Sequence, residues 1–177
     1  MTQESPTPAP AWDAVVRLTH WSVAALVLWN LFEDSGGPLH RNLGYAAAAL
    51  VALRLVWGVV GSPNARFAAW WPRVSTLRRY LASLRTGTPM KFASHNPLGA
   101  LGMLAMWGLV AALTATGWLS RLDAFWGEDW PIALHAWAAY ALLALVVLHV
   151  SAAIVMSVLH KDNLILAMLT GKKQRHD

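Results

Sequence analysis

Four stretches of about 20 apolar residues, separated by polar segments, constrain this chain more than any other feature of its sequence. They cover about 14–32, 39–60, 97–119 and 131–159. A helix of roughly 20 apolar residues is long enough to cross the hydrocarbon core of a bilayer. With 56% hydrophobic and only 13% charged residues, the chain also has too little charge to cover a soluble domain. The sequence therefore predicts an all-α integral membrane bundle of four transmembrane helices.

The polar ends of the chain suggest a simple domain organisation. Residues 1–12 are polar and rich in proline, and they lack the positively charged start of a cleaved signal peptide. We expect a disordered tail there. Residues 13–171 then form the single transmembrane domain, and 172–177 form a basic C-terminal tail.

The long loop between the second and third apolar stretches, at 64–94, is basic and contains no acidic residue. Its segment VSTLRRYLASLR, at 74–85, places apolar residues at helical spacing with arginines between them. This pattern predicts a basic helix lying on the cytoplasmic membrane surface. A solvated amphipathic helix is equally compatible with it. The cations of the loop are Arg66, Arg73, Arg78, Arg79, Arg85 and Lys91.

Charge is distributed unevenly over the two sides of the predicted bundle. Lysine and arginine gather in the 64–94 loop and the C-terminal tail, whereas the loops near 33–38 and 120–130 hold most of the acidic residues. The positive-inside rule then predicts that both termini are cytoplasmic, in the inner membrane of a bacterium. Because the cations follow this pattern, the net charge of +5 indicates contact with membrane lipid and not with nucleic acid.

The chain contains no cysteine. Thioether-linked haem, iron–sulfur clusters and thiolate zinc sites are therefore excluded. Any metal must be bound by histidine, methionine or oxygen.

Four of the seven histidines lie within or at the edge of the apolar stretches: His20, His40, His135 and His149. An ionisable side chain at membrane depth is costly and by default suggests function, although a single histidine is as readily explained by hydrogen bonding between helices. His135 and His149 are fourteen residues apart, nearly on one helix face and about 21 Å apart in height. The predicted depths then pair His40 with His135 and His20 with His149.

Two neutral nitrogen ligands from facing helices suit a six-coordinate haem iron with no open position. Zinc needs three or four ligands close together, and the apolar stretches contain no such cluster. The sequence therefore predicts two non-covalent haem b groups. His20 and His149 are predicted to hold the cytoplasmic one, and His40 and His135 the periplasmic one.

Three neighbours of these histidines are predicted to contact haem. Gly44 lies one turn after His40, where a missing side chain lets a porphyrin approach the backbone. Arg54 shares the face of His40 in the inner leaflet and is placed to neutralise a haem propionate. Arg17 is placed to do the same below His20, but a cation extending toward the membrane surface explains it equally well.

Two further histidines lie at the predicted cytoplasmic interface. His95 precedes the third apolar stretch, where Asn96 and Pro97 resemble a helix N-cap and first residue. His160 follows the fourth stretch. Both are candidates for a quinone site, since a quinone head group needs a proton partner. His176 is in the tail, and no role is expected for it.

Several motifs together resemble one known family. They are RLTHW at 17–21, LHRNLGY at 39–45, SHNPLGAL at 94–101, LH-x13-H at 134–149 and the closing LHKDNLILAMLTGKK. The chain resembles the bacterial cytochrome b561 family, which is similar to the b-type cytochrome subunits of nickel–iron hydrogenases. The resemblance covers about 12–173. It implies a four-helix dihaem protein with ligands from the first, second and fourth helices, and electron exchange between quinone, either ubiquinone or menaquinone, and a redox partner.

The leading functional hypothesis is an electron-transfer component linking the quinone pool to a c-type cytochrome or a dehydrogenase, and not a stand-alone enzyme. One alternative is a self-contained superoxide:quinone oxidoreductase. Another is the cytochrome b subunit of a hydrogenase. A third is a non-redox membrane protein whose histidines only pack or bind a transition metal.

The predicted orientation is testable with a reporter that is active only in the periplasm. Fused after Asp177, it is expected to be inactive, because the C-terminus is predicted to be cytoplasmic. A reporter active only in the cytoplasm, fused at the same residue, is the matched control. Activity of the periplasmic reporter would contradict the orientation.

Overall fold

The computed structural model describes residues 12–33, 35–88, 90, 92, 95–161 and 163–172, with the backbone alone at His160. The helices in chain order are α1 (Ala14–Phe32), α2 (Pro38–Val60), α3 (Phe67–Trp70), α4 (Val74–Arg85), α5 (Pro97–Leu119), the 3-10 helix η1 (Asp123–Phe125), α6 (Trp130–His160) and α7 (Leu164–Thr170). The predicted tails at 1–12 and 172–177 lie almost entirely outside the described residues.

Four helices are long and apolar enough to cross a membrane: α1, α2, α5 and Trp130–Leu159 of α6. They match the four predicted stretches to within one residue at each end, and the described residues contain no strand. This confirms the predicted all-α membrane bundle. The predicted start of the third helix is also correct, because the side chain of Asn96 accepts a hydrogen bond from Gly99 N at 2.8 Å and Pro97 follows it.

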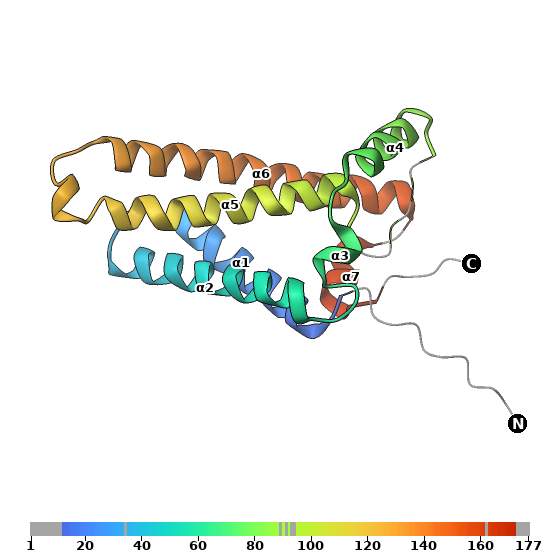
Figure 1. The fold of residues 1–177 in the computed structure, drawn as a ribbon, viewed down its shortest axis with the longest axis horizontal. Helices are drawn as coiled ribbons and strands as arrows, with labels where there is room; N and C mark the ends of the chain where they lie inside the picture. The colour runs from blue at the N-terminus through green and yellow to red at the C-terminus, as the bar shows by residue number, and fades with distance from the viewer. Residues whose placement is uncertain are drawn as a thin grey trace, which may run out of the picture.

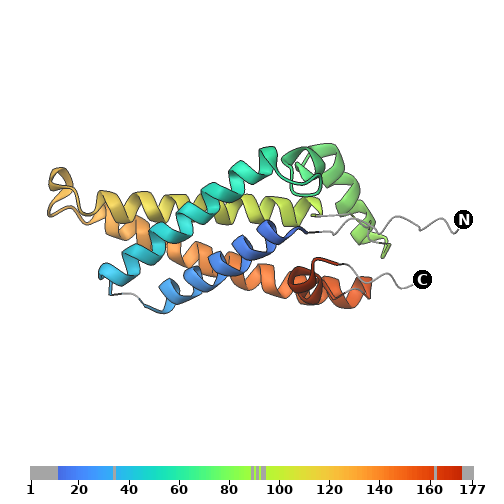
Figure 2. The same ribbon diagram turned by 90° about the horizontal axis from the view of Figure 1, so that it is seen from below.

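The long helices form two antiparallel pairs (Figure 1). α5 packs along α6, α1 packs along α2, and the contact of α2 with α5 joins the pairs. In the second view α1 and α2 are tilted relative to α5 and α6 (Figure 2). The α1–α2 connection and η1 lie at one end of the bundle, while α3, α4 and α7 lie at the other.

The centre of the bundle is a cluster of small and branched residues, formed by Ala47 and Val51 of α2, Val110 of α5 and Leu142 of α6. Large apolar side chains cover the outside instead. On α6, for example, Trp137 and Val158 are each 73% exposed. Such a surface is stable against lipid and unstable against water.

The predicted helix of the basic loop is α4, and its bounds agree with the prediction. Tyr80 is 2% exposed and meets Phe92 edge-on, with ring centres 5.6 Å apart. Arg78 and Arg79 are exposed. α4 projects from the bundle near the start of α5 (Figure 1).

The short helix α7 was not predicted from the sequence. Its caps are nevertheless regular: the Asn163 side chain accepts from Leu166 N at 2.9 Å, and Gly171 ends the helix at a φ of 81°. Arg17 of α1 contacts α7, because its Nη1 donates a hydrogen bond to the carbonyl oxygen of Leu169 at 2.5 Å. α7 therefore lies beside the start of α1.

Asp13 ties the start of α1 to the end of α2. One carboxylate oxygen accepts from Val16 N at 2.9 Å and caps α1. The other accepts from Trp57 Nε1 at 2.9 Å and from Ser62 Oγ at 2.5 Å. Burial alone would raise the pKa of Asp13, but the hydrogen bonds from Ser62, Val16 and Trp57 outweigh it and hold the pKa below its ordinary value of 3.8.

The substitution Asp13→Ala is expected to destabilise the protein by about 1–3 kcal/mol, since it removes a helix cap and leaves the Trp57 indole unpaired. Thermal unfolding in detergent measures this. Because the folded pKa is lowered, the stabilisation is fully present above pH 3.8 and is lost as the pH falls through the folded value. The control is Asp129→Ala, at the start of α6, whose side chain makes no capping bond. An equal effect of both substitutions would contradict the role of Asp13.

Candidate functional site

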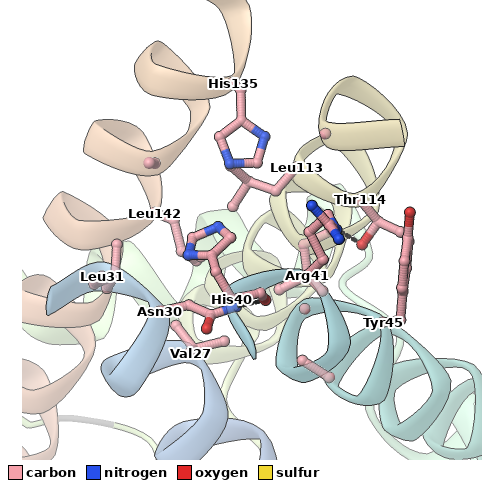
Figure 3. Close-up of a pocket in the computed structure, with 15 residues that line it drawn as sticks. Val27, Asn30, Leu31, His40, Arg41, Tyr45, Leu113, Thr114, His135 and Leu142 are labelled. Atoms are coloured by element: carbon pink, nitrogen blue, oxygen red, sulfur yellow. Dashed lines mark hydrogen bonds between the residues drawn. The ribbon is translucent and has the colours of Figure 1, made fainter. Parts of the chain in front are cut away.

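Two pairs of histidines face each other between helices. His20 of α1 and His149 of α6 have ring centres 6.2 Å apart, with 47° between their planes. His40 of α2 and His135 of α6 have ring centres 6.1 Å apart, with 54° between their planes. Figure 3 shows the second pair with the rings directed toward one another across a pocket. These are the two pairs that the predicted depths match.

α6 contributes one histidine to each pair. His135 and His149 are fourteen residues apart on an unbroken helix, which corresponds to about 21 Å along its axis. The two pairs therefore lie at different depths in the bundle.

The spacing of each pair fits one metal ion between two imidazoles. Because a metal–imidazole nitrogen bond is about 2 Å long, rings bound on opposite sides of one metal have centres about 6 Å apart. Both observed separations agree with this value. Among the described residues, no group of three or more histidine, cysteine, aspartate or glutamate side chains is placed to hold a metal ion. Two imidazole nitrogens without further protein ligands would suit the iron of a porphyrin.

The hydrogen bonds of His40 leave one ring nitrogen available for a metal. Its Nδ1 lies 2.6 Å from the backbone carbonyl oxygen of Glu33. A carbonyl oxygen only accepts, so Nδ1 carries the proton and Nε2 keeps its lone pair. Asn30 of α1 donates to the carbonyl oxygen of His40 at 2.9 Å and so positions the start of α2.

His135 has the same tautomer for a different reason. The hydroxyl of Thr116 donates to Ala112 O at 2.8 Å, so it accepts from His135 Nδ1 at 3.1 Å. Nε2 of His135 is again free to bind a metal. Gly117 leaves room for the ring, since an added Cβ would lie 3.3 Å from Cε1 and 3.4 Å from Nδ1 of His135.

One pocket lies between His40 and His135, and both rings line it. α1, α2, α5 and α6 all line it. Gly44 lies in its wall, and a Cβ there would approach Asn30 Nδ2 to 3.4 Å. Its contact with haem stays a prediction. Arg41 and Tyr45 also line it beside Thr114 (Figure 3), and the sequence did not single them out.

At the second pair, Nδ1 of His20 is buried without a hydrogen-bond partner among the described residues. The ring of His20 also meets Trp21 edge-on, with centres 5.1 Å apart. A buried imidazole without a polar partner at this spacing fits a metal ligand better than a residue that joins helices by hydrogen bonds.

The predicted arginines lie at the end of the bundle that holds α3 and α7. Arg54 is 5% exposed, and its Nη2 donates to Ala65 O at 3.1 Å. Its guanidinium lies 5.5 Å from the ring centre of Trp107, and its Nη1 is buried without a hydrogen-bond partner. Arg17 is directed to α7 instead, and its contact with a propionate stays a prediction.

Two tryptophan rings lie near the ring of His95. Its ring centre is 6.2 Å from that of Trp12 and 5.5 Å from that of Trp70. The side chain of His160 and all of His176 lie outside the described residues, so the quinone site predicted at His95 and His160 stays a prediction.

An apolar four-helix bundle with imidazole pairs spaced for haem iron is the construction of a b-type cytochrome. The family model described as "Prokaryotic cytochrome b561" matches residues 11–171. The chain belongs to the prokaryotic cytochrome b561 family and is a multi-pass membrane protein that transfers electrons with b-type haem. This confirms the resemblance seen in the sequence.

Named relatives are similar over nearly the whole chain. A probable Ni/Fe-hydrogenase B-type cytochrome subunit of Azotobacter vinelandii is 24% identical over 213 residues, covering 94% of this chain and 88% of the relative. A protein of the same name from Bradyrhizobium diazoefficiens is 24% identical, covering 94% and 86%. Cytochrome b562 of Cereibacter sphaeroides is 27% identical over 187 residues, covering 96% and 98%. No solved structure matches the chain significantly.

The substitution Gly117→Ala is expected to push the ring of His135 away from α5 by a few tenths of an ångström, because the new Cβ meets it at 3.3 Å. The electron paramagnetic resonance spectrum of the bound haem is then expected to change. Gly108→Ala, on the same helix, is the control, since its Cβ would have no neighbour within 4 Å. Identical spectra for both variants would contradict the contact.

Proposed function

We propose that this chain is a dihaem b-type cytochrome that moves electrons across the bacterial inner membrane between the quinone pool and a redox partner. The observation that supports this most strongly is the presence of two histidine pairs, with ring centres 6.2 and 6.1 Å apart. α6 separates the pairs by about 21 Å along its axis.

Haem b, held by these imidazoles, would supply a one-electron change at its iron. His20 and His149 hold the cytoplasmic haem in this proposal, and His40 and His135 the periplasmic one. Arg54 is the candidate for a propionate contact near the cytoplasmic haem, because its Nη1 is buried and unpaired among the described residues. Gly44 gives the porphyrin access to the backbone of α2.

The orientation follows from the charge at the two ends of the bundle. The end with α3, α4 and α7 holds exposed arginines of α4 and the exposed Lys161. The opposite end holds Glu33 and the acidic residues around η1. Both termini are then cytoplasmic, and α4 rests on the inner surface of the membrane.

A quinone, either ubiquinone or menaquinone, is the proposed exchange partner at the cytoplasmic end. His95 is the proton partner in this proposal, with the Trp12 and Trp70 rings beside it. Aromatic rings beside a titratable group suit a flat head group that takes up protons on reduction. His160 is the second candidate.

The other redox partner is a c-type cytochrome or a dehydrogenase. A hydrogenase is the second candidate, since two of the relatives carry the name of a hydrogenase subunit. Adding hydrogen gas to membranes distinguishes these partners. Reduction of the haem by hydrogen supports a hydrogenase. Reduction only by another donor supports a c-type cytochrome or a dehydrogenase. The whole proposal fails if purified protein shows no b-type bands in a reduced-minus-oxidised spectrum.

The pairing of ligands predicts the outcome of four substitutions. His20→Ala and His149→Ala are expected to lose one spectral component, and His40→Ala and His135→Ala the other, because each pair acts as a unit. Redox titration of the four variants measures this. If His20→Ala and His135→Ala removed the haem component with the same midpoint potential, the pairing would be wrong.

The quinone assignment predicts that His95→Ala keeps both haems and slows reduction of the protein by a quinol. Stopped-flow spectroscopy measures the rate. Loss of a haem in this variant would instead mean that the ligand set is wrong.

A further inference from the structure

Glu33 brings two acceptors to one ring nitrogen of His40. Its backbone carbonyl oxygen lies 2.6 Å from His40 Nδ1, and its carboxylate oxygen Oε2 lies 3.5 Å from the same atom. Oε2 is buried and has no hydrogen-bond partner among the described residues. A negative charge is therefore held against the side of the imidazole opposite the pocket.

The Glu33 carboxylate is fixed by its own loop. The Ser35 hydroxyl donates to Oε1 of Glu33 and accepts from Gly37 N at 3.1 Å. The backbone N–H of Glu33 donates to Trp29 O at 2.9 Å and closes the last turn of α1. These contacts hold the carboxylate in place without any contribution from the pocket.

We propose that Glu33 is a positioning residue that lowers the reduction potential of the haem held by His40 and His135 below that of the other haem, an inference that rests on the proposed function. An imidazole that donates Nδ1–H to a carbonyl oxygen, with a carboxylate oxygen 3.5 Å from the same nitrogen, is a more basic ligand at Nε2. A basic ligand and a nearby negative charge both stabilise the oxidised, more positive iron. The result is a lower potential at this site.

Among the described residues, no carboxylate lies beside the ring of His135, His20 or His149. Nδ1 of His135 donates to the neutral hydroxyl of Thr116. Nδ1 of His20 has no hydrogen-bond partner among the described residues. These imidazoles therefore have no negative charge beside them within the described part of the chain, and Glu33 distinguishes the two sites.

Positive charges act on both sites. Arg41 lines the pocket and raises the potential there, which partly offsets Glu33. Arg54 lies fourteen residues after His40 on α2, at about the depth of His149, and its buried charge raises the potential of the second site. Electron transfer from the pocket toward the end with α7 is then downhill.

The test is a redox titration of the haem-loaded protein with Glu33→Gln, which keeps the backbone carbonyl and the size of the side chain. At a fixed ambient potential, the reduced-to-oxidised ratio of one haem is expected to rise about tenfold, or about 59 mV for a one-electron couple. The other haem is expected to keep its midpoint. Glu128→Gln, an exposed residue in the loop at the same end, removes the same charge without touching a histidine and is expected to shift neither haem.

The affected component must be the one of lower potential in the unmodified protein, and the one lost in His135→Ala. Equal titration curves for Glu33→Gln and Glu128→Gln, or loss of the higher component in His135→Ala, would overturn the inference while leaving two b-type haems in place. An unmodified protein without two b-type components would instead overturn the proposed function.

Ser35→Ala decides the matter where Glu33→Gln fails to retain haem. This variant keeps the carboxylate but removes the hydroxyl that holds Oε1, so the carboxylate is no longer fixed beside His40. The midpoint potential of the same haem is expected to shift in the same direction by a smaller amount. An unchanged midpoint for that haem would overturn the inference.

Discussion

The arrangement of the helices depends on one constraint. In each of two histidine pairs, imidazole rings from different helices face each other with their ring centres about 6 Å apart. α6 supplies one member of each pair, so α1 and α2 must both approach it at defined heights. α5 packs between α2 and α6 and holds the ring of His135 through Thr116 and Gly117. His20 lies near the start of α1 and His40 near the start of the antiparallel α2, so the two histidines meet α6 at different depths.

Several polar groups find their hydrogen-bond partners at the ends of helices. Asp13 joins the start of α1 to the end of α2, Arg17 binds the last turn of α7, and the Glu33 carbonyl at the end of α1 holds His40. Water is absent from the hydrocarbon region, so each donor or acceptor there must find a partner in the protein or in a cofactor. The groups that find none among the described residues, such as His20 Nδ1 and Arg54 Nη1, are therefore the natural places to look for haem contacts.

Sequence reasoning identified the four spans, the basic helix at 74–85 and the N-cap at Asn96, because each depends on local composition and spacing. It missed α3 and α7, whose four and seven residues are too short for hydrophobic periodicity to reveal. Only the caps at Asn163 and Gly171 marked α7, and such residues also occur in ordinary turns. It also missed Glu33, Thr116 and Arg41, because nothing in their local sequence shows which side chain from another helix they meet.

The amino-acid sequence by itself determined the membrane environment, the number of crossings and the fourteen-residue spacing of His135 and His149. These properties are local, since length, apolarity and helical rise need no knowledge of packing. Only the tertiary structure decided which atoms contact each imidazole: the carbonyl and carboxylate of Glu33 at His40, the hydroxyl of Thr116 at His135, and no described acceptor at His20. Those contacts join residues on different helices or at the ends of different helices, and their geometry depends on how the helices cross, which is set by the packing of whole side-chain surfaces.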